Sequence, residues 1–109
     1  MMINLSSSKN SGLPMAESDL DDLIEAAITK NVLAGDKANK QGDFQLAEQL
    51  YSHAIHLAEI KFGAKAAAVG YLLAILADLY ELQNRKEDAV ALHARVKEIL
   101  NDYVKVPDR

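Results

Sequence analysis

The sequence predicts an all-α fold in which two antiparallel helix pairs stack on each other. Length is the first observation, because 109 residues are enough for one domain but not for two. The second is that both prolines, Pro14 and Pro107, lie near the ends and leave the interior free of helix breakers. The third is that apolar residues recur at helical spacing between a few Gly and Asn positions.

The first helix is predicted over residues 19–40, preceded by Ser18 as its cap. Asp21 stands three residues after Ser18, as in a capping box, and the many acids of residues 17–25 suit the positive end of the helix dipole. Residues 1–16 are rich in Ser, Asn and Gly, so we expect a disordered, mobile N-terminal tail that contributes nothing to folding. Residues 17–109 then form a single helical domain.

The second helix is predicted over residues 44–62, between two glycines. Gly42 suits the left-handed position that ends a helix, Asp43 can cap the next one, and Gly63 ends it. This helix carries two adjacent apolar stripes, so we expect it to contact more than one neighbour.

The third and fourth helices are predicted over residues 64–82 and 86–104, with Asn84 at the left-handed position between them. Residues 66–77 carry no charge, which raises the question of what covers them. The uncharged run is shorter than the roughly 20 residues that a membrane-spanning helix needs. The sequence therefore predicts a buried helix. The fourth helix is apolar on one face only, so its other face is expected in solvent.

Composition argues against several classes of function. The chain has no cysteine, which rules out disulfides, zinc–thiolate sites and thiol catalysis and fits a reducing compartment. The net charge of −4, without a basic stripe, argues against a nucleic-acid partner. The N-terminus lacks the pattern of a signal peptide, so the expected location is the cytoplasm.

A helix–turn–helix unit occurs twice in the sequence. Sliding the chain by 42 residues superimposes similar residues, and a fixed period of this kind is typical of repeat architectures. The matching pairs are Asp36 with Asp78, Gln41 with Gln83, Gly42 with Asn84, Ala47 with Ala89, and Leu50 with Leu92.

The segment LAGDKANKQGDFQLAEQLYSHAIHLA resembles a tetratricopeptide repeat. The residues that carry the resemblance are Gly35 in the first helix, Gly42 at the turn, Phe44 opening the second helix, and Ala47, Tyr51 and Ala54 along it. The second copy, ILADLYELQNRKEDAVALHARV, keeps Ala77, Tyr80 and Ala89. The 42-residue spacing is similar to that of the repeats of kinesin light chains.

The resemblance implies two helical hairpins, at about residues 28–63 and 64–104, stacked right-handedly with a concave face formed by the first helix of each repeat. It implies a non-catalytic protein–protein interaction module, an adaptor or scaffold that needs no cofactor. The alternative is a structural, homo-oligomeric helical protein that binds no peptide. The expected partner-binding groove is lined by Val32, Asp36, Asn39, Lys40, Tyr71, Ala74, Ile75 and Asp78. Because Asp36 and Asp78 occupy equivalent positions, we expect a bound protein or peptide segment to be basic.

The third helix has more apolar residues than its two neighbours can cover. A large exposed apolar patch is rare on monomers, so we expect self-association, as a two-fold homodimer or as an end-to-end stack. The residues expected at this contact are Tyr71, Leu72, Ile75, Leu79 and Leu82.

Residues that suggest chemistry are few. His53 and His56 lie three residues apart on one helix face, followed by Glu59, but no further ligands appear at metal-binding spacing. We therefore interpret His53, and likewise His93, as packing residues and expect neither a metal site nor an enzyme. Ser52 beside His53 does not suggest a nucleophile, because sequence neighbours on a helix point apart.

Overall fold

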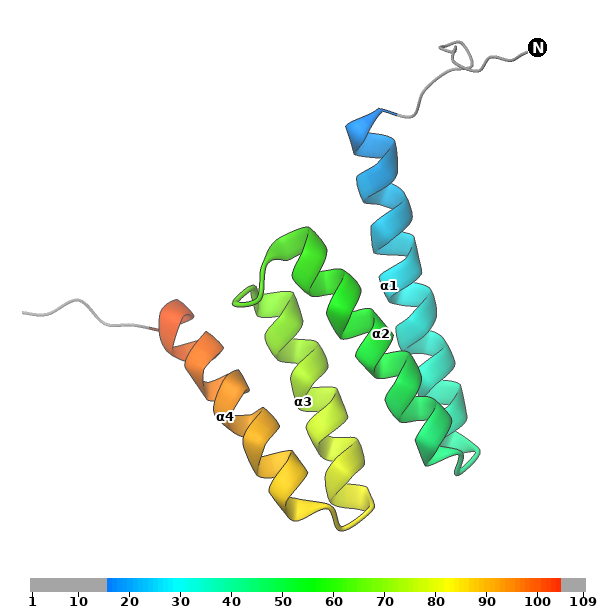
Figure 1. Cartoon of the computed structure of the whole chain (residues 1–109), viewed down its shortest axis with the longest axis vertical. Helices are drawn as coiled ribbons and strands as arrows, with labels where there is room; N and C mark the ends of the chain where they lie inside the picture. Colours follow the sequence, from blue (N-terminus) through cyan, green and yellow to red (C-terminus); the bar gives the residue numbers. More distant parts are fainter. Residues whose placement is uncertain (1–15, 105–109) are drawn as a thin grey trace, which may run out of the picture.

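The computed structural model describes residues 16–104, and this part of the chain is all-α and contains no β-strand. Its helices are α1 (Glu17–Lys40), α2 (Phe44–Phe62), α3 (Ala67–Leu82) and α4 (Lys86–Tyr103). Figure 1 shows them side by side in chain order, each antiparallel to the one before it. The predicted all-α fold with two helix pairs is confirmed. The predicted N-terminal tail lies, except for Ala16, outside the described residues.

The first helix begins two residues earlier than expected, at Glu17. Ala16 is its N-cap, and Ser18 lies inside the helix, so the prediction that Ser18 caps it is wrong. The physical reason lies three residues on, where an Asp19 carboxylate oxygen accepts the backbone N–H of Ala16 at 3.4 Å. Asp19 thus makes one of the two hydrogen bonds of a capping box. The other is missing because the N-cap residue, Ala16, has no side-chain acceptor.

The turns inside the two helix pairs have the predicted geometry. Gly42 has φ +80° and Asn84 has φ +62°, both in the left-handed region that favours these residue types. Asp43 caps α2 as expected, because its carboxylate accepts the N–H of Leu46 at 3.2 Å. The turn chemistry predicted for both helix pairs is therefore confirmed.

The connection between the two pairs is longer than predicted. Gly63 ends α2 with φ +97°, but α3 begins at Ala67 rather than at residue 64. Ala66, the N-cap of α3, has no side-chain oxygen that could accept a backbone N–H of the first turn. The hydroxyl of Tyr103, at the end of α4, instead accepts the N–H of Ala67 at 3.1 Å.

The core is built around α2, which packs against both α1 and α3, while α4 packs against α3. Its centre combines alanines with larger apolar residues, and the small side chains let the helices approach closely. A Cβ on Gly35 would lie 2.7 Å from the ring of Tyr51, so only glycine fits under this ring. The buried apolar residues include Ala47, Tyr51, Ala54 and Ala58 of α2 and Leu73, Leu76 and Ala77 of α3, all expected inside.

The uncharged run that begins at Ala66 is covered mainly from within the chain. Most of its residues from Val69 to Ala77 are buried or half-buried, and Tyr71 is the exception. No helix within residues 16–104 combines the length and the hydropathy that crossing a membrane requires.

Candidate functional site

A cavity between α1 and α3 contains two of the residues expected in the concave groove. Val32 and Tyr71 line one cavity of about 260 Å³, and Leu72 and Ala68 of α3 complete its far wall. Tyr71 is the prominent residue here, because 68% of its surface is exposed. An exposed aromatic side chain beside an apolar hollow is typical of surfaces that bind proteins.

The remaining predicted groove residues do not join this cavity. Ala74 lies on the other side of Tyr71, in a second hollow, and Ile75 packs against the core. Lys40 and Asp78 are exposed, and Asn39 is half-buried.

The carboxylate of Asp36 is already hydrogen-bonded within the chain. The hydroxyl of Tyr51 donates a hydrogen bond to its carboxylate at 2.5 Å, linking α2 to α1. Burial and the nearby Asp36 carboxylate raise the pKa of Tyr51 above its usual value of 10.0. We expected Asp36 and Asp78 to bind a basic segment together. The carboxylate of Asp36 is instead hydrogen-bonded to Tyr51 within the first helix pair, which leaves Asp78 as the exposed acid of the two.

A second apolar hollow of about 480 Å³ lies between α3 and α4. Its floor contains Gly70, where a Cβ would come within 3.2 Å of Ile99. Tyr71 stands between this hollow and the α1–α3 groove, because it lines both. The other residues of the second hollow are Ala67, Ala74, Val96, Leu100 and Tyr103.

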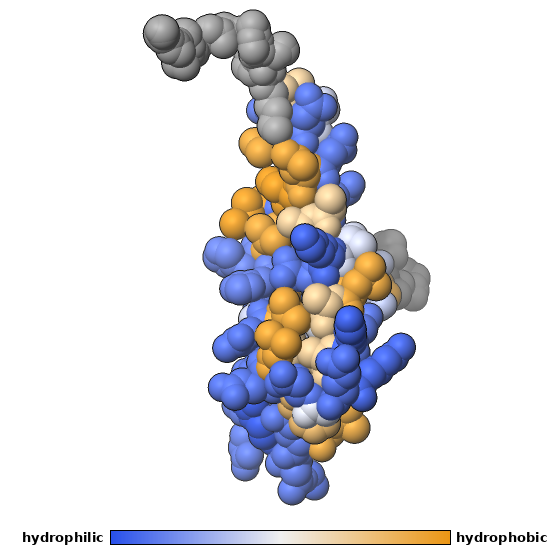
Figure 2. Space-filling model, turned by 90° about the vertical axis from the view of Figure 1, so that its right-hand side faces the viewer, coloured by the Kyte–Doolittle hydropathy of each residue, from blue (hydrophilic) through white to orange (hydrophobic). Residues whose placement is uncertain are grey.

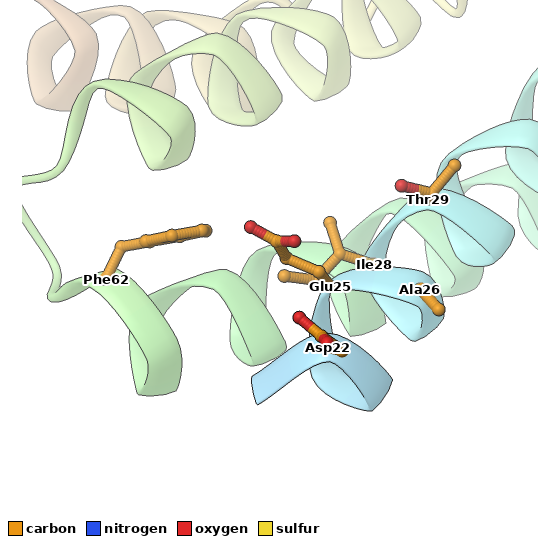
Figure 3. A pocket seen from close by; sticks show the side chains of 6 residues that line it. All are labelled: Asp22, Glu25, Ala26, Ile28, Thr29 and Phe62. Atoms are coloured by element: carbon orange, nitrogen blue, oxygen red, sulfur yellow. The ribbon is translucent and has the colours of Figure 1, made fainter. Parts of the chain in front are cut away.

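A third cavity, of about 530 Å³, opens between the N-terminal half of α1 and the end of α2. Figure 3 shows the ring of Phe62 on one side and the carboxylates of Asp22 and Glu25 on the other, with Ile28 behind them. From the sequence, these acids are explained only by the positive end of the helix dipole. Sequence reasoning missed the cavity because nothing local places Phe62, 40 positions after Asp22, opposite them.

A polar network joins the two helix pairs on the side of Glu48. This half-buried carboxylate of α2 accepts hydrogen bonds from the Tyr80 hydroxyl and from the Arg85 guanidinium, each at 2.8 Å. Arg85 also binds Asp88 at 2.9 Å and lies over the ring of Tyr80, 4.1 Å from its centre. The network fixes the α3–α4 turn against α2.

The network shifts the pKa values of its members. Burial raises the pKa of Glu48, but the hydrogen bonds from Arg85 and Tyr80 outweigh burial and the net shift is downward. Burial and the hydrogen bond to Glu48 raise the pKa of Tyr80 to about 12. Each partner therefore stabilises the other in the protonation state that it has at neutral pH.

The histidines are surface residues, and their interpretation as packing residues is wrong. His53 and His56 are exposed, because the buried face of α2 passes through Tyr51, Ala54 and Ile55 instead. His93 is also exposed and lies 3.0 Å from the carboxylate of Glu81. Within residues 16–104 no group of three or more His, Cys, Asp or Glu side chains is placed to hold a metal ion.

Two of the five residues expected at a self-association contact are covered by the chain itself. Leu72 is 5% exposed and Leu79 is 1% exposed, so the expectation that they remain uncovered is wrong. Both belong to the buried core cluster, where α2 and α4 pack against α3. Ile75 is half-buried, whereas Tyr71 and Leu82 are exposed.

Other exposed apolar side chains lie at the two ends of the helix row. Figure 2 looks onto the outer side of α1 and shows an apolar patch over its N-terminal half, where Leu20 and Leu23 are exposed. At the opposite end, α4 exposes Val90, Leu100 and Tyr103, and Val104 directly after α4 is exposed as well. Leu20, Leu23, Leu100 and Tyr103 share the helical spacing of core residues, so sequence periodicity does not distinguish them from the core.

Comparison with protein-family models, with curated proteins and with solved structures finds no match for this chain. The tetratricopeptide resemblance therefore stays a prediction based on residue positions.

Proposed function

We propose that this chain is a non-catalytic protein–protein interaction module, a helical adaptor or scaffold of tetratricopeptide type that acts in the cytoplasm. The observation that supports the proposal is the position of Tyr71, exposed between two apolar hollows on the helix row. Apolar area in water is unfavourable by roughly 25 cal/mol per Å², so a partner that covers this surface gains binding free energy. The large aromatic ring offers that partner an anchor at low cost in side-chain entropy.

The position of the glycines and tyrosines supports the tetratricopeptide part of the proposal. Gly35 lies under Tyr51, and Gly42 and Asn84 occupy equivalent turn positions. These are positions at which the resemblance expects a small residue, a large aromatic and a turn residue.

The test compares which proteins are captured by the parent chain and by two variants of it. Tagged full-length chain, Tyr71→Glu and Val90→Glu are used as baits under identical conditions. Val90 is as exposed as Tyr71 but lies on α4 away from both hollows, so it controls for a new surface charge. We expect Tyr71→Glu to lose the specific partners and Val90→Glu to keep them. Equal capture by all three baits would contradict the proposed surface.

The second candidate is a structural protein that acts by self-association and binds no peptide. The exposed Tyr71, Leu82, Leu100 and Tyr103 around α3 and α4 favour it. Light scattering at tens of micromolar should give about twice the 11.9 kDa of one chain, and Leu100→Glu should lower that mass. A constant mass of one chain would reject self-association and leave the adaptor as the proposal.

A further inference from the structure

The acidic cavity between α1 and α2 and the apolar groove between α1 and α3 are parts of one surface. Ile28 and Thr29 line both of them, so the two hollows meet along the same stretch of α1. The hollows together form a continuous trough that follows α1 from Asp22 to Leu33. Helical residues rise about 1.5 Å each, so this stretch is roughly 15 Å long.

The two ends of the trough differ in chemistry. At one end Val32, Leu72 and the exposed Tyr71 offer apolar walls with almost no polar atoms. At the other end the carboxylates of Asp22 and Glu25 face the ring of Phe62, which is 44% exposed (Figure 3). An apolar side chain suits the first end, whereas a cation suits the second, where acids and an aromatic face act together.

The acids at this end are not neutralised by the described chain. Within residues 16–104 no ion pair or hydrogen bond engages the carboxylate of Asp22 or Glu25, whereas the carboxylate of neighbouring Asp21 is paired with Lys61 at 3.7 Å. Lys61 is the cation beside Phe62, 5.2 Å from the centre of its ring. The trough therefore keeps a net negative end even after Lys61 is counted.

We propose that the trough binds a partner segment in which an apolar side chain is followed, three to five residues later, by lysine or arginine. An extended chain advances about 3.3 Å per residue, so about four residues span the distance from Val32 to Asp22. This inference rests on the proposed function and states which partner chemistry fits it. It relocates the expected basic-partner contact from Asp36, which binds Tyr51, to Asp22 and Glu25.

The test uses three synthetic peptides and the full-length, isotope-labelled protein. The first peptide carries two leucines followed, after three serines, by two arginines. The second replaces the arginines by glutamates, and the third replaces the leucines by serines. Binding is followed through amide chemical shifts. We expect the first peptide to shift residues 22–33 and 68–72, and the other two to bind at least roughly tenfold more weakly.

Protein variants then test whether Asp22 and Glu25 are the acids that bind the arginines. The double variant Asp22→Asn with Glu25→Gln should bind the arginine peptide roughly tenfold more weakly, and the affinity should depend less on salt concentration. Glu98→Gln with Asp102→Asn makes the same change of net charge on exposed positions of α4 and should leave affinity within about twofold. These four side chains are exposed, so the variants are expected to fold.

The inference would be overturned by equal binding of the arginine and glutamate peptides, by equal affinity of both double variants, or by chemical-shift changes confined to the α3–α4 hollow. Preferential binding of the glutamate peptide, lost in Tyr71→Glu, would keep the proposed function and reject only this partner chemistry. If no peptide shifts the trough residues, the inference also fails, and the capture experiment with Tyr71→Glu decides the proposed function separately.

Discussion

The two helix pairs share one pattern of residues, yet equivalent positions differ in burial. Tyr51 of α2 is 2% exposed and packs over Gly35, whereas His93, 42 positions later on α4, is exposed and paired with Glu81. Ala58 of α2 is fully buried, whereas its counterpart Leu100 is 53% exposed. The difference follows from neighbours: α2 packs against both α1 and α3, whereas α4 packs mainly against α3 and reaches α2 through the ion pair of Arg95 with Glu59 at 3.0 Å.

This comparison shows that repeat position alone does not determine burial. The side of a second helix that faces away from its own pair becomes core only when a further helix packs beside that pair, as α3 does for the first. The second pair has no such neighbour within residues 16–104, and its equivalent surface is the hollow between α3 and α4.

The largest expected effect separates the two equivalent aromatic positions. Tyr51→Ala should lower the free energy of unfolding by about 3–5 kcal/mol, because a buried ring is lost and a cavity remains above Gly35. His93→Ala should change it by no more than about 0.5 kcal/mol, since that side chain is exposed. Urea unfolding followed by circular dichroism measures both. Similar losses in the two variants would mean that the pairs are packed alike.

A smaller difference is expected between the two helical glycines that touch large side chains. Gly35→Ala places a methyl group 2.7 Å from the buried Tyr51 ring and should destabilise by about 1–3 kcal/mol, despite the better helix propensity of alanine. Gly70→Ala meets the Ile99 methyl at 3.2 Å, a contact that a small shift relieves. Its propensity gain of about 1 kcal/mol should largely offset the strain. Thermal unfolding of both variants tests this order. A greater loss of stability in Gly70→Ala than in Gly35→Ala would contradict it.

The smallest effect concerns the Glu48 network, which ties the pairs together. The pKa of Glu48 is lowered from 4.5 by folding, so its contribution to stability is present above about pH 4.5 and is lost as the pH falls below it. The pKa of Tyr80 is raised from 10.0 to about 12, so its contribution is present below pH 10 and is lost as the pH rises toward 12.

Two variants separate these contributions by unfolding in urea across pH. The parent should be more stable than Glu48→Gln by about 1 kcal/mol at pH 7, and this advantage should disappear in acid. Tyr80→Phe should reduce the alkaline loss, with the remainder expected from Tyr51, whose pKa is also raised. A Glu48→Gln curve that stays parallel to the parent curve down to acid pH would show that the pKa of Glu48 is not shifted by folding.

The local features of the fold followed from sequence because their causes lie within a few residues. The φ angles of Gly42 and Asn84 and the cap at Asp43 depend on side chains at or beside the turn. The bounds of α2 were predicted for the same reason. The start of α3 was not, because its first N–H is capped by Tyr103, which lies 36 positions later.

The sequence by itself determined the all-α class, the repeat, the turns and much of the core, since helical periodicity and turn chemistry are short-range properties. Only the tertiary structure decided which apolar and acidic residues remain available to a partner. The Tyr51 hydroxyl engages Asp36, and Leu72 and Leu79 lie in the core, while Phe62 comes to face Asp22 and Glu25. These outcomes depend on the angles and offsets between packed helices, which a residue pattern along one helix does not contain.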